Sequence, residues 1–513
     1  MTDHLTAVIR FPGAEYTQRA VLEAARQVLP AASTDFRTDI KDGEASERLC
    51  SEAGADRKTL FFCDYDLLPF EGLLKASRYA LCSSYVIRKA LIRKHYLAHA
   101  LHTYHLKHGQ GSQGTIGQHV TPKTWHVEIN FADELDELLL DDLYDLNEAL
   151  EQNEESPPAQ QQWFILKPAM ADRGNGIRLF SSLDSLREIF EEFESADDDE
   201  DDETAEGEGQ ERGSQPDENS PKRDTAVMMS QLRHFVIQVR IFSTRYGEVM
   251  EYISSPLLLR APSSSQPISA RKFHLRAYVL CTGSLKVYLA DEMLALFAPL
   301  PYTSPGATDN DGADDTYASE DLRRHLTNTC LQAQDDGQGH SRVSEENVFL
   351  FSELEGMAYS SPQTQMTLAQ DQSTDSTGPT LSSEQLAAIK AGVVKTLAHT
   401  FKACATAGSI NWQMWPNAFE VFGVDLLVEF KPESERTEPF KIWLLEINAQ
   451  PDFAQTGSRL EPTIQHLFRR VFELAVVPFF GEDPSLSEPE PRKEGESHDG
   501  VTLCLDLPLS KAW

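Results

Sequence analysis

The sequence predicts an α/β (α+β) protein made of several lobes, and three stretches support this fold class. Residues 1–75 alternate short apolar strands with a helix-like segment, as a small α/β lobe does. Residues 270–280 alternate polar and apolar side chains, which is typical of a half-buried strand. Residues 420–453 contain two short apolar runs separated by a charged loop, which predicts a pair of buried strands.

The remaining elements follow from local pattern. Helical spacing of apolar residues predicts helices, and short apolar runs bounded by turn residues predict strands. The long helix near the C-terminal third begins with a capping-box pattern at Ser382 or Ser383. In chain order we expect a strand at 7–11, a helix at 20–29, a strand at 60–64, a helix at 83–104, a strand and acidic helix in 126–152, a strand–loop–strand in 163–180, strands at 234–238, 251–259 and 284–302, and a helix at 382–405.

Length and composition limit the class of protein. A chain of 513 residues has room for about two to four domains and a large core. No apolar run reaches the roughly 18 residues that a membrane helix needs, and no basic segment followed by an apolar one opens the chain. The seven cysteines are scattered, without a CxxC pair, as reduced cysteines are. We therefore expect a cytoplasmic or nuclear protein, cytoplasmic by preference, with no membrane span, no secretory signal and no zinc site. We also expect a monomer.

The charge is strongly acidic and unevenly distributed. A formal net charge of −35 argues against nucleic-acid binding through a basic surface. Much of the excess lies in an acidic tract that we interpret as a disordered insert over about 191–226. Low-complexity stretches at 303–319 and 359–383 are interpreted as further inserts, and residues 481–513 as a tail.

Three polar residues stand among the apolar residues of the predicted strand pair. Alternation turns Asp425 away from its apolar neighbours and sets Glu446 and Asn448 on one face, about 7 Å apart. Two buried carboxylates cost several kcal/mol unless they are paired or coordinated. Two carboxylates and an amide oxygen form a Mg²⁺ ligand set when nucleotide phosphates complete the shell. The alternative is a strand pair whose polar residues face solvent.

Two other stretches carry residues suited to binding phosphate. In 163–180 a strand ends at Lys167, and the loop after it contains Gly174 and Gly176, which would let the backbone close over phosphates. A plain Gly-containing hairpin would have the same pattern. In 270–280, alternation places Lys272, His274 and Arg276 on one strand face, where they would hold a polyphosphate or simply face solvent.

Taken together, five motifs in order resemble the tubulin–tyrosine ligase and ligase-like family, whose fold is ATP-grasp. They are RKALIRK (88–94), K–P…G–N–G–I (167–177), VIQ…EYISSPLLL (236–259), RKFHLR (271–276) with HLTN (325–328), and FGVDLLVEF…WLLEINAQP (422–451). The resemblance implies an N-terminal α/β lobe (1–80), a central ATP-grasp lobe (81–260) and a C-terminal ATP-grasp lobe (261–480).

The resemblance also implies an activity and its reactants. Such enzymes use ATP and Mg²⁺ to phosphorylate a carboxylate, and an amine then attacks the acyl phosphate to form an amide. The implied reactants are a free amino acid, with tyrosine favoured over glutamate or glycine, and a protein acceptor such as the α-tubulin C-terminal tail or another acidic protein. An alternative is an ATP-binding but catalytically degenerate module that acts as an interaction protein in cytoplasmic mRNA-processing bodies.

Roles carried over from the family fall on matching positions of this chain. The implied catalytic residues are Arg276 and Glu446, and the implied metal ligands are Asp425, Glu446 and Asn448. The implied nucleotide contacts are Lys89, Lys167, Gly174, Gly176, Gln238, Tyr252, Ile253, Lys272, His274 and Asn328.

The chain departs from the family pattern at three places. His274 stands where the family usually has an Asp, and Leu296 where it has an Arg that engages phosphate or the acceptor. Residues 239–250 separate VIQ from EYISSPLLL, either as a real loop or as a gene-model error. An acidic acceptor would further need a local basic groove. Candidates for that groove are Arg88, Lys89, Arg93, Lys94, Arg271, Arg323 and Arg324.

Overall fold

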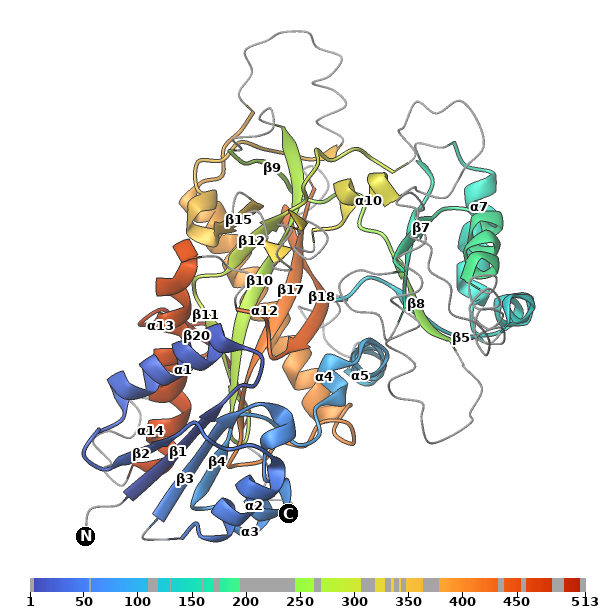
Figure 1. The fold of residues 1–513 in the computed structure, drawn as a ribbon. Coiled ribbons are helices and arrows are strands. Elements are labelled where there is room, and N and C mark those ends of the chain that lie inside the picture. Colours follow the sequence, from blue (N-terminus) through green and yellow to red (C-terminus); the bar gives the residue numbers. More distant parts are fainter. Residues whose placement is uncertain are drawn as a thin grey trace, which may run out of the picture.

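A computed structural model gives the fold of the chain (Figure 1). The structure describes residues 4–54, 57–108, 119–129, 131–157, 160–168, 176–193, 245–262, 269–305, 319–327, 334–335, 341–342, 347–362, 378–431, 438–453, 458–481 and 493–507. Most of the three predicted inserts and the predicted strand at 234–238 lie outside the described residues.

The first element group is a four-stranded parallel sheet with the order β2-β1-β3-β4. Helix α1 packs its small apolar face, which includes Val21 and Ala24, against this sheet. The side chain of Asp42 caps α2 by accepting a hydrogen bond from the Ala45 amide. The predicted strands and helix of this lobe are present, with bounds β1 (His4–Arg10), α1 (Glu15–Val28), β2 (Thr34–Arg37), α2 (Gly43–Ser51), β3 (Arg57–Cys63), α3 (Phe70–Lys75) and β4 (Ala80–Cys82).

Two helices connect this lobe to a smaller antiparallel sheet, which stands apart from the rest in Figure 1. The smaller sheet has the order β5-β8-β6-β7 and a core of its own that includes Trp125, Phe164 and Phe180. Bounds of this region are α4 (Lys89–Ile92), α5 (Lys94–His108), β5 (Thr124–Ile129), α6 (Leu135–Leu140), α7 (Tyr144–Glu154), β6 (Phe164–Pro168), β7 (Arg178–Phe180) and β8 (Arg245–Glu251).

The central place of β8 corrects the interpretation of 239–250 as a loop. Residues 245–250 belong to a strand that pairs with β5 on one side and β6 on the other. Residues 239–244 lie outside the described part of the chain. The backbone of β8 therefore hydrogen-bonds to both β5 and β6, although in the sequence residues 245–250 interrupt the family motif.

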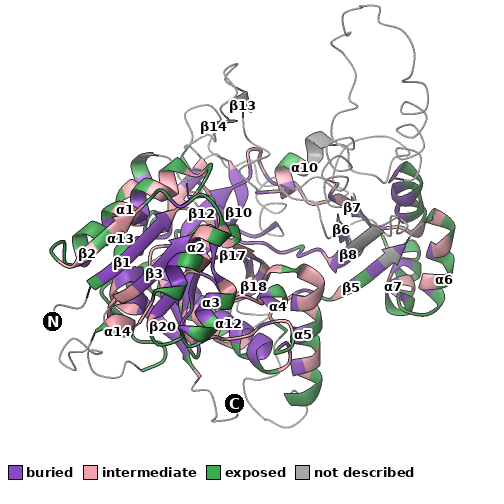
Figure 2. Ribbon diagram, turned by 60° about the horizontal axis from the view of Figure 1, so that its bottom comes forward, coloured by how far each residue is buried: buried purple, intermediate pink, exposed green. Residues whose placement is uncertain are grey.

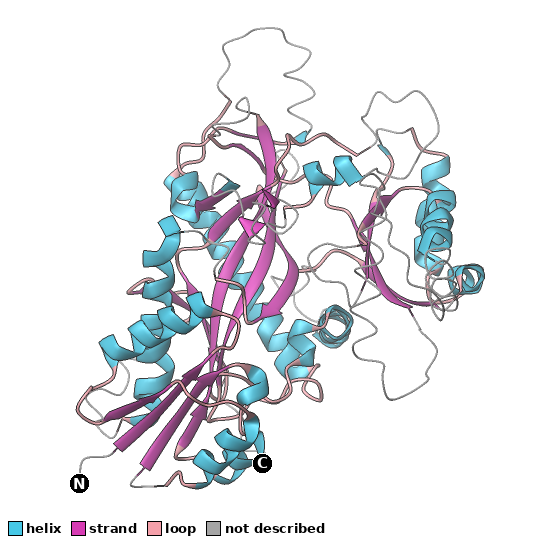
Figure 3. Cartoon of the chain, in the orientation of Figure 1, coloured by secondary structure: helices cyan, strands magenta, loops and turns pink. Residues whose placement is uncertain are grey.

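The largest element is a ten-stranded sheet in which β10 pairs with four other strands. Both faces of β10 are largely buried: Phe273, Leu275 and Ala277 face one core cluster, and on the other face Tyr278 and Leu280 join a second cluster beyond the site residues Lys272, His274 and Arg276. Figure 3, in the orientation of Figure 1, shows the paired strands β10 and β17 as long strands in the middle of this sheet. Bounds are β9 (Leu258–Arg260), β10 (Ala270–Thr282), β11 (Lys286–Ala290), β12 (Leu294–Phe297), α10 (Ser319–His325), β13 (Gln334–Asp335), β14 (Ser341–Arg342), β15 (Val348–Leu350), β16 (Tyr359–Ser360), α12 (Ser383–Thr406), β17 (Phe419–Phe430), β18 (Phe440–Ala449), α13 (Glu461–Val471), α14 (Val477–Phe480), β19 (Ser497–His498) and β20 (Val501–Asp506).

The prediction of a tail over 481–513 is wrong for its last apolar segment. Residues of β20 pair with β11 and so continue the ten-stranded sheet. The predicted helix at 382–405 is present as α12, and the side chains of Ser382 and Gln385 form the capping box at its start.

The N-terminal lobe is packed firmly onto the large sheet. The ring of Phe62 on β3 lies 5.1 Å from that of Phe419 on β17 and 5.6 Å from that of Phe472, measured between centroids. The Cys82 amide also donates to the Asn417 carbonyl at 3.1 Å. Buried residues accordingly run through both sheets in Figure 2. Within the described ranges, no helix combines the length and apolar character that crossing a membrane requires.

Candidate active site

Strand register brings the predicted site residues of β10, β17 and β18 onto one sheet face. Arg276 lies opposite Asp425, Asp425 opposite Glu446, and Gly423 opposite Asn448. Directly paired residues of antiparallel strands point to the same side. The polar residues of the three strands therefore converge as expected, and a register shift between Asp425 and Leu426 leaves Leu445 of β18 as the extra, unpaired residue.

Asp425 is a buried carboxylate whose charge is neutralised by Arg276, a half-buried arginine. The Arg276 guanidinium donates from Nε to Oδ1 and from Nη2 to Oδ2, the latter at 2.9 Å. His274 Nε2 lies 3.5 Å from Asp425 Oδ1. Burial alone would raise the pKa of Asp425, but Arg276 and then His274 hold this pKa well below its ordinary value. Asp425 is therefore ionised throughout the physiological range.

Glu446 and Asn448 complete an acid–acid–amide cluster with Asp425. The amide nitrogen of Asn448 lies 3.2 Å from Glu446 Oε1 and 3.5 Å from Asp425 Oδ2, so it joins the two carboxylates. On the far side of Glu446, Lys94 Nζ lies 3.5 Å from Oε2. Both carboxylates are thus matched by positive charge.

The donor set of this cluster fits a hard divalent cation. Two carboxylates, and one amide whose oxygen would face the ion once the Asn448 side chain turns over, are the oxygen ligands that Mg²⁺ prefers. The cluster holds only two carboxylates, and among the described residues no group of three His, Cys, Asp or Glu side chains could hold a metal ion. A cation held here would need oxygens from a phosphate or water to complete its shell.

A second polar group surrounds Lys272 farther along β10. Lys272 Nζ donates to the Tyr252 hydroxyl at 3.2 Å, and that hydroxyl lies 2.9 Å from His325 Nδ1. Burial, followed by the charge of Lys167, lowers the pKa of Lys272 to about 7. Burial, followed by Lys272, lowers the pKa of His325 to about 3, so the imidazole that shares a hydrogen bond with the Tyr252 hydroxyl is neutral.

A model of the tubulin-tyrosine ligase family matches residues 77–484. The chain belongs to the tubulin-tyrosine ligase family. A probable tubulin–tyrosine ligase of Schizosaccharomyces pombe is 35% identical over 420 residues, which cover 82% of this chain and 83% of that protein. The probable tubulin–tyrosine ligase PBY1 of Saccharomyces cerevisiae is 31% identical over 492 residues, or 94% of this chain, and the chain spans 53% of that relative's length.

A solved structure shares the fold. It is the C-terminal domain of K. lactis Pby1, described as an ATP-grasp enzyme that interacts with the mRNA decapping enzyme Dcp2. The two match with a TM-score of 0.58 and 25% sequence identity, over 98% of this chain and 99% of that one. The predicted ATP-grasp fold is thereby confirmed.

Two of the departures from the family pattern face each other across β10 and β12. His274 lies opposite Leu296 in the register of these strands, and both are buried. His274 Nδ1 lies 2.5 Å from the Thr327 hydroxyl, so part of the HLTN segment contacts it directly. The resemblance to the family implies an Asp and an Arg at these positions, which would be oppositely charged. Here both are replaced together, by an imidazole and an apolar side chain.

The other predicted nucleotide contacts lie on several different elements or outside the described residues. Tyr252 and Ile253 are buried beside the smaller sheet, and Lys167 is half-buried at the end of β6. Gly176 has a φ of +70°, a conformation that favours glycine. Lys89 is exposed at the start of α4. The expected contacts that lie outside the described residues are Gly174, Gln238 and Asn328.

The predicted basic groove is wrong for two of its members. Arg88 is buried, pairs with Glu420 at 3.0 Å and covers the ring of Tyr65. Arg271 is only 2% exposed and donates to Asn347 at 2.6 Å. Both arginines are therefore structural members of the core. The sequence did not identify the contact between Lys94 and Glu446, although Lys94 belongs to the RKALIRK motif.

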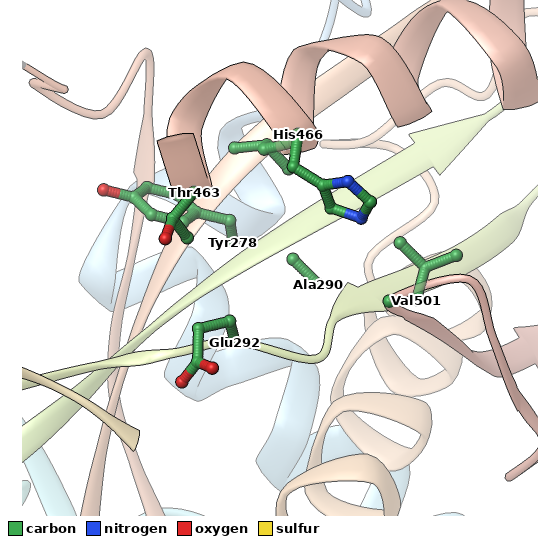
Figure 4. A pocket seen from close by; sticks show the side chains of 8 residues that line it. Tyr278, Ala290, Glu292, Thr463, His466 and Val501 are labelled. Atoms are coloured by element: carbon green, nitrogen blue, oxygen red, sulfur yellow. The ribbon is translucent and has the colours of Figure 1, made fainter. Parts of the chain in front are cut away.

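A small pocket lies away from this site, between α13 and the strands β10, β11 and β20 (Figure 4). Its lining includes Tyr278, Glu292 and His466, and none of the predicted site residues. A side chain at Gly500 would meet His466 Nε2 at 2.6 Å, so the imidazole covers this turn. The pocket therefore belongs to the packing of the C-terminal strands against α13.

Proposed function

We propose that this protein is an ATP- and Mg²⁺-dependent ligase that joins a free amino acid to a protein carboxylate. The observation that carries the proposal is the convergence of Asp425, Glu446 and Asn448 on one sheet face, with Arg276 paired to the first of them. A partly buried acid cluster with its own cations contributes little to stability, and it is well suited to a charged ligand.

The reaction we propose has two balanced steps. A carboxylate oxygen of the acceptor attacks the γ-phosphorus of ATP, so the bond to the β–γ bridging oxygen breaks and ADP leaves. The amino group of the free amino acid then attacks the acyl carbon, phosphate leaves and one proton is released. Both steps move negative charge between oxygens, so the protein must position the reactants and neutralise that charge.

Residues of this chain match those requirements. Asp425, Glu446 and Asn448 would hold Mg²⁺, which when bound supplies a Lewis acid for phosphate oxygens. Lys272 and Lys167 would bind phosphate, and Tyr252 and Ile253 would border the adenine. The half-buried Arg276 guanidinium lies at the cluster, where its donors could turn to an acyl phosphate.

The reactants are proposals that follow from the family. We favour tyrosine as the amino acid and an acidic acceptor such as the α-tubulin C-terminal tail. The net charge of −35 opposes encounter with an acidic acceptor, so exposed cations near the site, such as Lys89 and Arg323, would have to attract it locally.

Incorporation of labelled amino acids tests the ligase. Purified protein with MgATP is incubated with tubulin or with cell lysate and a panel of labelled amino acids. We expect label in a protein acceptor with wild-type chain and none with Glu446→Gln, which keeps the shape of the side chain but removes its charge. Equal label with both variants would contradict the proposed site.

A second candidate is an ATP-binding interaction module without ligase activity, acting in cytoplasmic mRNA-processing bodies. Two observations favour it: the joint change to His274 and Leu296, and the similarity to K. lactis Pby1, described as interacting with a decapping enzyme. MgATP that raises the melting temperature without ADP formation or label transfer would favour this module. Turnover that depends on Glu446 would exclude it.

A further inference from the structure

Lys94 occupies an unusual position for a lysine. It is the first residue of α5, where the helix dipole disfavours positive charge, and the first turn of α5 contains no acidic residue. Its ammonium group instead reaches across to β18 and lies 3.5 Å from Glu446 Oε2. The side chains of Lys94 and Glu446 are 22% and 26% exposed, so the pair lies at the edge of the site.

The contacts of the cluster balance its charge without any bound ion. Asp425 is paired with Arg276, Glu446 is paired with Lys94, and the Asn448 amide joins the two carboxylates. Two negative charges therefore face two positive ones. A divalent cation that enters the cluster must compete with these side-chain cations.

The two side-chain cations differ in how readily they can leave. Arg276 and Lys94 are similarly exposed, with side chains 20% and 22% exposed, but the planar fork of Arg276 holds Asp425 at two points. Lys94 is partly exposed, makes one longer contact, and carries its charge on a flexible stem. Metal binding would therefore displace Lys94 from Glu446 far more easily than Arg276 from Asp425.

We propose that Lys94 is a positioning residue that holds Glu446 in the metal-free site and leaves it when a divalent cation binds. This inference rests on the proposed function, because it takes the cluster to be a metal site. In the metal-free protein the ammonium keeps Glu446 directed toward Asn448. Once displaced from Glu446, the Lys94 ammonium lies at the edge of the cluster, where it would contact an anionic reactant.

The test measures Mn²⁺ affinity without nucleotide, by titration followed through the electron paramagnetic resonance of free Mn²⁺. Because Lys94→Gln removes a competing cation, we expect it to bind Mn²⁺ about two- to fivefold more tightly than wild type. Lys94→Met should do the same, and Lys94→Arg, which keeps the charge, should stay close to wild type. Lys107→Gln, on the exposed last turn of the same helix, is the matched control and should match wild type.

The outcomes separate this inference from the proposed function. Mn²⁺ affinity that is unchanged or weaker in both Lys94→Gln and Lys94→Met would overturn the role of Lys94 alone. Wild-type protein that binds no Mn²⁺, with or without ATP, would overturn the metal site and the role of Lys94 together. A merely structural lysine would not produce tighter binding on removal, so the expected direction discriminates between the two roles.

Discussion

Arg276 on β10 and Asp425 on β17 are joined at two points across adjacent strands, with Nη2 to Oδ2 at 2.9 Å. The pair is largely buried, with side chains 20% and 6% exposed. Removing one partner of a buried pair leaves an uncompensated charge, whereas removing both charges is far less harmful. The stability of the pairing between β10 and β17 is therefore sensitive to substitution of either residue alone.

We expect Arg276→Gln to lower the free energy of unfolding by about 3–5 kcal/mol. Adding Asp425→Asn to that variant should recover part of the loss, because the carboxylate that lost its cation is then neutral. Chemical denaturation followed by circular dichroism measures both effects. A loss below about 1 kcal/mol in the single variant would show that the pair contributes little.

Glu420 should make stability depend on pH. Burial raises the pKa of Glu420 to about 7, more than its partner Arg88 lowers it, against an ordinary value of 4.5. The folded state therefore binds a proton between those values that the unfolded state has released. The contribution of Glu420 is present below pH 4.5 and is lost as the pH rises through 7. Relative to Glu420→Gln, wild type should lose on the order of 3 kcal/mol of stability over that window. If the free energies of unfolding of wild type and Glu420→Gln change with pH in parallel, the raised pKa of Glu420 is contradicted.

Lys272 should take up a proton when nucleotide binds. Its pKa of about 7 leaves most of the amine neutral at pH 8, and nearby phosphate would favour the ammonium form. Calorimetric titration with MgATP at pH 8, in two buffers of different ionisation enthalpy, should show uptake approaching one proton. Lys272→Met should abolish the uptake, and Lys402→Met, an exposed position on α12, should preserve it. Equal binding heats for wild type in both buffers would contradict phosphate binding by Lys272.

The facing positions 274 and 296 should behave as a coupled pair. Leu296→Arg alone places a cation among buried apolar residues, and His274→Asp alone adds a carboxylate close to Asp425. Both changes together put opposite charges at directly paired positions of β10 and β12. The double variant should therefore be about 1–3 kcal/mol more stable than the sum of the single losses predicts. Denaturation of the four proteins gives the coupling, and strict additivity would argue that the two side chains do not meet.

Local pattern predicted much of the fold and the centre of the site. The polar residues Asp425, Glu446 and Asn448 stand out because their strands are otherwise apolar, and a period of two assigns their faces. The same reasoning placed Lys272, His274 and Arg276 together. Helix α12 was recognisable because its apolar spacing and its cap at Ser382 are adjacent in sequence.

Contacts between distant segments could not be predicted in this way. Nothing near Lys94 in the sequence indicates that it meets Glu446, and Arg88 has the same motif context although it is buried against Glu420. A charged residue at the start of a helix gives the same local sequence pattern whether its side chain reaches the site, as that of Lys94 does, or is buried, as that of Arg88 is. The place of β8 was missed because residues 245–250 appeared to interrupt a family motif.

The pairing of β20 with β11 affects how the protein should be produced. The family match ends at residue 484, so a recombinant version trimmed to that limit would lack the final strand. One side of β11 would then present unpaired amide and carbonyl groups, and such an edge promotes self-association. Expression designs should keep residues up to at least Asp506 and carry any affinity tag beyond that point or at the opposite terminus.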